Sequence, residues 1–296
     1  MRRRLLRRTV AGTLAVVILG VGVVLATGAG SGGGAPHHPP ALAVKLRQVK
    51  PAPVRHLRGL SPAGLENIKR LLALGLPIYC GGRQGNAVAF TFDDGPGVYT
   101  HYALRKLERA HARATFFVVG RSIRAWPGWL RREGRMAALG DHTMTHQDLV
   151  AMAPVQAFDE IYRARQVIQH DSGQRVELFR PPYGAHDRIV DTIVHRLGML
   201  DIMWSVDSAD SLGANYAGII RNVTQGLRPG AIIEMHENRG QTIRALTRLL
   251  PELRRRHLHS VSVLSLLATD PPSPAQLHRG ESGCGGRARI GGRGIE

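Results

Sequence analysis

Short apolar segments alternate with amphipathic ones along most of the chain. Runs of β-favouring apolar residues, bounded by glycine, proline or polar residues, predict strands at residues 88–92, 114–119, 177–180, 200–206, 231–235 and 260–263. Apolar residues spaced three and four apart predict a helix before the first strand, at residues 62–74, and helices between the strands, at residues 101–110, 126–138, 154–169, 187–197, 216–225 and 241–256. This alternation predicts an α/β fold with a parallel sheet, either doubly wound or closed into a barrel.

The segments outside this alternation differ in composition. The chain begins with arginines followed by an uncharged apolar run at residues 10–26, which is typical of a signal peptide or a signal-anchor helix. We therefore expect an extracytoplasmic protein, membrane-anchored through this segment or secreted. The predicted organisation is a signal or anchor segment at 1–27, a flexible Gly- and Pro-rich linker at 28–56, an N-terminal extension with a short helix at 57–83, the main domain at 84–270, and an extended Gly- and Arg-rich tail at 271–296.

The net charge and the cysteine content indicate which partners and which compartment suit the protein. The chain of 296 residues has a net charge of +18, so a polyanion such as an anionic cell wall, a membrane surface or a nucleic acid is a natural neighbour. We do not expect nucleic-acid binding, because no recognition-helix, zinc-finger or aromatic signature accompanies the arginines. Cys80 and Cys284 are the two cysteines, and in an exported protein they permit one disulfide.

Two adjacent carboxylates follow the first predicted strand. Asp93 and Asp94 lie between this strand and a Gly-Pro-Gly turn at residues 95–97. Adjacent strand residues point to opposite sides, so the two carboxylates can serve different purposes at one strand end. In isolation the same residues also fit a solvated turn in which one Asp caps the next helix.

A histidine pair is the second candidate feature. His142 and His146 are four residues apart, and on a helix they would face the same way, which suits two ligands of one metal ion. With Asp94 as a third ligand they would form a site of two histidines and one carboxylate. The pair lacks the Glu of a His-Glu-x-x-His motif, so a general base would come from elsewhere, and Asp93 is available. The chain has 14 histidines, so chance spacing is the alternative.

Three later segments place polar residues at strand ends. Arg180 precedes a rigid Pro-Pro-Tyr-Gly loop, where it either holds Asp93 with two parallel hydrogen bonds or is an ordinary surface arginine. Carboxylates at 207 and 210 follow the strand predicted at 200–206, and His236 follows the strand predicted at 231–235. A histidine at a strand end serves either as an acid catalyst or as a satisfied structural residue.

In order and context, these segments resemble the NodB-homology polysaccharide deacetylases, carbohydrate esterase family 4. The resemblance rests on Thr-Phe-Asp-Asp-Gly at 91–95, His-Thr-Met-Thr-His at 142–146, Arg-Pro-Pro-Tyr-Gly at 180–184 and the strand ending in His236, and it covers residues 88–267. It implies a distorted (β/α)7–8, TIM-like barrel with its site at the carboxyl ends of the strands. It also implies an actinobacterial-type member, secreted or membrane-anchored.

The resemblance implies a role for each motif residue. Asp94, His142 and His146 would hold a divalent metal ion, commonly zinc. Asp93 would be the general base and Arg180 its holder, and the backbone N–H of Tyr183 would help to stabilise the oxyanion. His236 would be the general acid, with Asp210 as the first and Asp207 as the second choice for the carboxylate behind it. Hydrolysis of an amide needs an activated water, a Lewis acid at the carbonyl and a proton for the nitrogen, which these groups supply.

Three positions depart from the family pattern. Asp141 stands where the family often has Asn, and a fourth carboxylate near the metal would raise its affinity or shift the metal preference. Ser211 stands where the family often has Trp, which removes an aromatic wall for a sugar. Glu234 occupies a position that is usually apolar.

The implied activity is metal-dependent hydrolysis of N-acetyl groups on a cell-wall or extracellular polysaccharide. Peptidoglycan N-acetylglucosamine is the expected substrate, since export and positive charge favour an anionic wall polymer. The alternatives are a chitooligosaccharide or acetylxylan deacetylase, or a catalytically silent carbohydrate-binding module. We expect a monomer whose partner is the polysaccharide.

Overall fold

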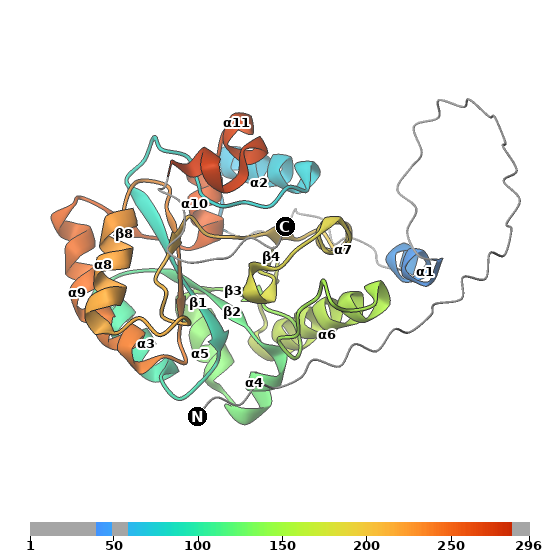
Figure 1. The fold of residues 1–296 in the computed structure, drawn as a ribbon, viewed down its shortest axis with the longest axis horizontal. Coiled ribbons are helices and arrows are strands. Elements are labelled where there is room, and N and C mark those ends of the chain that lie inside the picture. The colour runs from blue at the N-terminus through green and yellow to red at the C-terminus, as the bar shows by residue number, and fades with distance from the viewer. Residues whose placement is uncertain (1–39, 49–58, 286–296) are drawn as a thin grey trace, which may run out of the picture. The chain divides into compact units, whose positions relative to one another are not determined.

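The structure is a computed structural model that describes residues 40–48 and 59–285 (Figure 1). The predicted signal or anchor segment, most of the predicted linker and the end of the tail lie outside the described residues. Within the described ranges, no helix has the length and the apolar character needed to cross a membrane.

A curled parallel sheet forms the centre of the fold. Its strands are β1 (Ala87–Gly95), β2 (Ala114–Val118), β3 (Ala138–Asp141), β4 (Leu178–Phe179), β5 (Leu200–Asp201), β6 (Val206–Asp207), β7 (Ile232–His236) and β8 (His259–Ser260). The strand order is β5-β4-β3-β2-β1-β7-β6, and β8 pairs with the start of β1. All of these pairs are parallel, so the carboxyl ends of the strands share one rim. The expected α/β fold, a distorted barrel, is confirmed.

Most helices cover the outer face of the sheet, whereas α2 (Pro62–Leu74) and α10 (Val263–Thr269) pack against the side chains inside its curl (Figure 1). The helices are α1 (Pro40–Gln48), α2 (Pro62–Leu74), α3 (Thr100–Arg109), α4 (Gly120–Ala125), α5 (Trp129–Met136), α6 (Pro154–Ser172), α7 (Arg188–Arg196), α8 (Tyr216–Gly226), α9 (Gly240–Arg255), α10 (Val263–Thr269) and α11 (Pro274–His278). Several begin with side-chain caps in the expected way; Ser61, for example, accepts a hydrogen bond from the backbone of Gly64 at the start of α2.

The sheet is buried on both faces. Along β1, Phe90 and Phe92 belong to the hydrophobic cluster under the helices, whereas Ala89 belongs to a second cluster inside the curl. The two faces follow from the alternation of side chains along a strand. A parallel sheet covered on both faces explains why the predicted strands are continuous apolar runs.

Three predicted elements differ from the structure. The strand predicted at 200–206 is split into β5 and β6, because the backbone carbonyls of Ile202 and Met203 accept hydrogen bonds from the Arg180 side chain. The helix predicted at 126–138 ends at Met136, and Ala138 already begins β3. The strand predicted at 260–263 is confined to β8, since helix α10 starts directly after it.

Two segments predicted to be irregular are partly ordered. Residues 40–48 of the predicted linker form α1, whose Leu42 is buried in the main hydrophobic cluster. The predicted tail contains α11, which begins at a capping box on Ser273, and a 3-10 turn at Gly280–Cys284. Cys284 is bonded to Cys80, so the permitted disulfide forms and ties this segment back to the start of the domain.

Candidate active site

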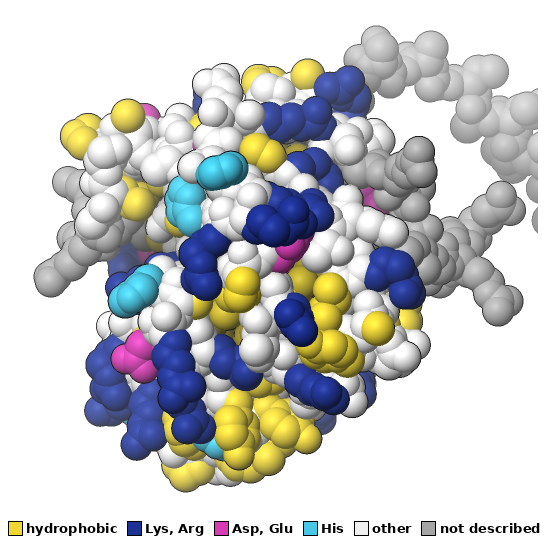
Figure 2. Space-filling view, turned by 90° about the vertical axis from the view of Figure 1, so that its left-hand side faces the viewer, with side chains coloured by type: hydrophobic (Ala, Val, Ile, Leu, Met, Phe, Trp, Pro, Cys, Tyr) yellow, Lys and Arg dark blue, Asp and Glu magenta, His cyan; other side chains and the backbone are white. Residues whose placement is uncertain are grey.

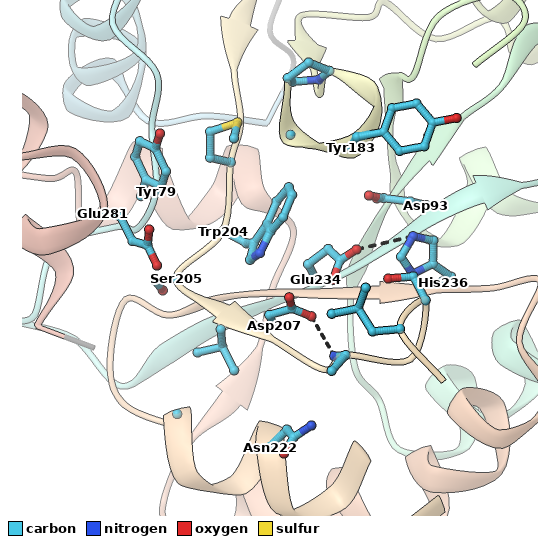
Figure 3. A pocket seen from close by; sticks show the side chains of 18 of the residues that line it. Tyr79, Asp93, Tyr183, Trp204, Ser205, Asp207, Asn222, Glu234, His236 and Glu281 are labelled. Atoms are coloured by element: carbon cyan, nitrogen blue, oxygen red, sulfur yellow. Dashed lines mark hydrogen bonds and ion pairs between the residues drawn. The ribbon is translucent and has the colours of Figure 1, made fainter. Parts of the chain in front are cut away.

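A cavity of about 1240 Å³ opens at the carboxyl ends of the strands (Figure 3). The lining includes these predicted site residues: Asp93, Asp94, His142, His146, Tyr183, Asp207 and His236. Arg180 and Asp210 lie buried directly behind it, in hydrogen-bonding contact with residues of the lining. The fold therefore brings together all of the predicted site residues from segments far apart in the sequence.

A β-bulge turns both adjacent carboxylates toward this cavity. The pairing of β1 with β2 shifts register between Asp93 and Gly95, and Asp94 adopts a φ of 72°. Strict alternation would have sent the two side chains to opposite faces, as the sequence predicts. The bulge overrides this alternation, and both residues line the cavity.

Arg180 is the buried brace of the site. Its side chain is 0% exposed, and its Nη1 donates to Asp93 Oδ1 at 2.8 Å and to Thr91 Oγ1 at 2.7 Å. Its Nε and Nη2 donate to the carbonyls of Ile202 and Met203. Arg180 therefore contacts Asp93 through one nitrogen rather than through the two parallel bonds that we expected, and its remaining donors connect β1 to the chain after β5.

The histidine pair lies in a loop after β3, so it is not a helix that makes the two side chains face the same way. Thr143 and His146 have positive φ values of 67° and 62°. Asp141 Oδ1 accepts the Thr143 N–H at 2.8 Å, and the Thr143 hydroxyl accepts the His146 N–H at 2.9 Å. These local bonds hold a tight loop where a helix would otherwise begin. Positive φ at residues other than glycine is a strained geometry that gathers at functional sites.

Three potential ligand atoms converge on one point. The Nε2 atoms of His146 and His142 lie 3.2 Å and 3.8 Å from Asp94 Oδ1. Because a carbonyl can only accept, the contact of 2.7 Å between His142 Nδ1 and the Arg180 carbonyl makes Nδ1 the donor. His142 Nε2 therefore presents its lone pair to Asp94, which is the tautomer that a metal ligand needs.

The donor set fits a divalent metal ion. Asp94 Oδ1 is buried and has no hydrogen-bond partner among the described residues. Burial raises the pKa of Asp94, but the contact with His146 and the charges of His142 and His236 outweigh it and hold this pKa well below its usual range. Burial lowers the pKa of His142, which favours the neutral ring. An ionised carboxylate and neutral imidazoles are the ligands that zinc prefers.

A second cluster surrounds His236 at the end of β7. His236 Nδ1 lies 2.7 Å from Asp210 Oδ1, and the other carboxylate oxygen accepts the backbone N–H of His236 at 2.8 Å. The Thr242 hydroxyl also donates to Asp210. The structure therefore pairs His236 with Asp210. Asp207, the second choice, instead accepts the Ala209 N–H and lies on the cavity wall.

Glu234 is the unexpected member of this cluster. Its side chain projects from β7 toward the cavity, and its Oε1 lies 3.3 Å from Nε2 of His236 (Figure 3). Its Oε2 is buried without a hydrogen-bond partner in the described part of the chain, and burial raises the pKa of Glu234. Burial lowers the pKa of His236, but the Asp210 hydrogen bond and the Glu234 charge prevail and raise it to about 10.

Aromatic side chains form the mouth of the cavity. Tyr183 is 70% exposed, has a φ of 62° and places its ring 4.8 Å from the His146 ring, edge to face. Trp204 also lines the cavity (Figure 3). These two aromatic side chains therefore line the cavity, and Ser211 stands on the lining where the family often has an aromatic residue.

Asp141 does not belong to the cluster of potential ligands formed by Asp94, His142 and His146. It is 0% exposed, and its Oδ1 accepts the backbone N–H of Thr143. Burial raises its pKa. The expectation of a fourth carboxylate at the metal is therefore wrong, and the residue is better described as a brace of the ligand loop.

Sequence reasoning missed two supporting residues. Thr91 precedes Asp93 by two positions in the same strand, so its side chain reaches Arg180 from the same face. That spacing was a usable signal. Thr242 supports Asp210 from helix α9, and no sequence pattern links these two positions.

Comparisons with known proteins place this site in a family. The model of the polysaccharide deacetylase family matches residues 81–201. The chain is 34% identical to a chitooligosaccharide deacetylase of Bradyrhizobium sp. (strain ANU 289), and the match covers 57% of this chain and 85% of that protein. It is 30% identical to a peptidoglycan-N-acetylglucosamine deacetylase of Listeria monocytogenes serotype 1/2a, over 61% of this chain and only 39% of that protein.

Solved structures resemble the fold over a similar range. A family 4 carbohydrate esterase from Streptomyces lividans, in complex with acetate, matches with a TM-score of 0.57 and 30% identity over 61% of this chain and 92% of that one. A CE4 family pseudoenzyme from Bacillus anthracis matches with a TM-score of 0.62 and 26% identity over 64% and 68% of the two chains. The chain therefore belongs to the polysaccharide deacetylase family and is a hydrolase of carbon–nitrogen bonds other than peptide bonds.

Proposed function

We propose that the chain removes N-acetyl groups from an extracytoplasmic polysaccharide with the help of a bound divalent metal ion, zinc being the first choice. The observation that supports this proposal most directly is that three potential ligand atoms converge in one cavity. Beside them lie the Asp93 carboxylate, bonded to Arg180, and the His236 ring, bonded to Asp210. A protein that only binds a carbohydrate would need neither a general base nor a general acid.

Each residue has a chemical task in this proposal. Asp94, His142 and His146 would hold a divalent ion, which when bound would supply Lewis-acid activation of an acetyl carbonyl and of water. Asp93, fixed by Arg180, accepts the proton of the attacking water. His236 delivers a proton from Nε2 to the leaving amine.

The positions of Asp93 and His236 support the roles of base and acid. Asp210 fixes His236 through Nδ1, so only Nε2 can face a substrate. Asp93 and His236 are direct partners in the pairing of β1 with β7, which places the proposed base and acid next to each other at the rim. A substrate amide bound between them would meet the base on one side and the acid on the other.

For the substrate, we propose peptidoglycan N-acetylglucosamine. The relatives include deacetylases of both peptidoglycan and chitooligosaccharides. A net charge of +18 favours an anionic wall polymer over a neutral one. Chitooligosaccharide and acetylxylan remain the alternatives for the same chemistry.

A silent carbohydrate-binding module is the second candidate, because a solved relative is a pseudoenzyme. This chain keeps Asp93, Arg180 and the three ligand residues, which a binding module does not require. We therefore favour the enzyme.

Acetate release by the zinc-loaded full chain tests the proposal. Peptidoglycan, N-acetylglucosamine oligomers and acetylated xylan would be offered in parallel, with Asp93→Asn as the inactive control. We expect release from peptidoglycan and none from the variant, with binding of the polymer retained. Polymer binding by both proteins without release by either would support the binding module instead.

A further inference from the structure

A second group of potential ligands lies outside the cavity. Ligand atoms of His186, Asp191 and Asp201 all lie within 4.8 Å of one another. The three residues come from the loop after the Pro-Pro-Tyr-Gly turn, from helix α7 and from strand β5. None of the three lines the cavity described above.

Asp201 is the residue that points to a ligand. It is 5% exposed, and both of its carboxylate oxygens are buried without a hydrogen-bond partner in the described ranges. Its neighbours Leu200 and Ile202 pack inside the curl of the sheet, so Asp201 points to the outer face, toward α7. A buried carboxylate without a partner is costly, which is why such groups pair with cations or bind metals.

The nearby cations do not satisfy this carboxylate. His186 Nδ1 lies 2.9 Å from Asp191 Oδ1, and its other ring nitrogen faces the Tyr79 hydroxyl at 3.4 Å. Arg180 contributes favourable charge, but its hydrogen bonds go to Asp93, to Thr91 and to two backbone carbonyls. Burial raises the pKa of Asp201 to about 7, as expected for a carboxylate that lacks a direct partner.

We propose that His186, Asp191 and Asp201 bind a second divalent transition-metal ion, distinct from the one at the active site. One imidazole and two carboxylates suit zinc and similar ions, whereas calcium and magnesium prefer all-oxygen sites. His186 and Asp191 are partly exposed, so an ion can enter from solvent, and Asp201 closes the site from the sheet side.

The position gives this ion a structural task. His186 follows Tyr183 by three residues, and Tyr183 lies at the mouth of the cavity. A metal bound to His186 fastens the end of this loop to α7 and β5 at once. It would therefore stabilise the loop without touching a substrate.

Zinc stoichiometry of the full chain tests the proposal. The protein would be stripped of metal, reloaded with Zn²⁺, dialysed and measured by elemental analysis. We expect two zinc ions per chain in the wild type and one in Asp201→Asn, which keeps the shape of the side chain. Asp94→Asn should also lose one ion, from the other site, and the combined variant should lose both.

A matched control separates this site from adventitious surface binding. His170 and Asp171 form an exposed pair at 2.7 Å that lacks a buried carboxylate. Asp171→Asn should keep both zinc ions, and Zn²⁺ should raise the melting temperature of Asp94→Asn but not that of the Asp94→Asn/Asp201→Asn variant. One zinc ion per wild-type chain that is lost in Asp94→Asn, or two zinc ions in Asp201→Asn, would overturn the proposal. Either result would leave the assignment of the active-site metal intact.

Discussion

At the scale of single residues, the surroundings of the proposed acid, His236, raise its pKa strongly. His236 is held on one ring nitrogen by Asp210 and faces the Glu234 carboxylate with the other. With its pKa raised to about 10, His236 keeps its proton at neutral pH. The negative charge of Glu234 helps to keep His236 protonated. The Glu234 carboxylate also contacts Nε2, the nitrogen that must donate its proton to the substrate.

Glu234→Gln should therefore change the pH dependence of the reaction. The substitution removes one of the charges that raise the pKa of His236, so this pKa falls. A general acid works only while it is protonated, so the alkaline limb of the kcat/KM profile should move to lower pH. The profile of acetate release measures this. An alkaline limb that stays in place or moves up would contradict the assigned contact.

Asp93→Asn tests the proposed base. Asparagine keeps the size of the side chain but cannot accept the proton, so kcat should fall by about 10²- to 10⁴-fold. Zinc content should stay at the wild-type value, because the ligand atoms belong to Asp94, His142 and His146. Elemental analysis and acetate release are measured on the same sample. Full activity in this variant would exclude Asp93 as the base.

The chemistry of these residues could be predicted from the sequence, whereas their local geometry could not. Asp93, Asp94 and His236 were expected at strand ends, and each is there. A strained loop, and not a helix, brings His142 and His146 together, and the sequence does not reveal it because positive φ values leave no periodic pattern. Glu234 stood out as an unusual polar residue in an apolar strand, but its contact with His236 depends on the fold.

At the scale of elements, the sequence pattern does not predict the short strand β3 and the short helix α11. Strand β3 has four residues and follows a helix directly, so its pattern merged with the helical one. Helix α11 lies in a segment that composition alone marks as irregular, and the bond between Cys80 and Cys284 holds that segment against the domain. Short elements fixed by tertiary bonds are the ones that propensity misses.

The disulfide should stabilise the protein through this closure. It spans a sequence separation of 204 residues. Replacing both cysteines by serine should lower the free energy of unfolding by about 2–4 kcal/mol, the usual range for such a bond. Urea unfolding measures the change, and the wild type under reducing conditions is the matched control. Equal midpoints for the oxidised protein and the double variant would contradict a stabilising role.

At the scale of the whole molecule, positive charge is the dominant surface property. The face seen in Figure 2 carries many lysine and arginine side chains and few acidic ones. Helix α9, for example, contributes arginines 244, 248, 254 and 255. Such a surface attracts an anionic polymer at long range and does little for a neutral one.

Salt should therefore distinguish the candidate substrates. Raising the ionic strength from 0.01 to 1 M shortens the Debye length from about 30 Å to about 3 Å. We expect KM for peptidoglycan to rise steeply over this range, while KM for neutral N-acetylglucosamine oligomers stays nearly constant. Initial rates of acetate release measure both. If KM rose equally with salt for both substrates, the positive charge would no longer favour an anionic wall polymer as the substrate.

The most direct test of the central claim is the metal dependence of the reaction. Acetate release would be followed in the metal-stripped full chain during titration with Zn²⁺, beside Asp94→Asn and His146→Ala. The account predicts no release without metal, recovery as zinc fills the site in the wild type, and no recovery in either variant. Full activity of the stripped protein, or recovery in the variants at the same zinc concentration, would contradict it.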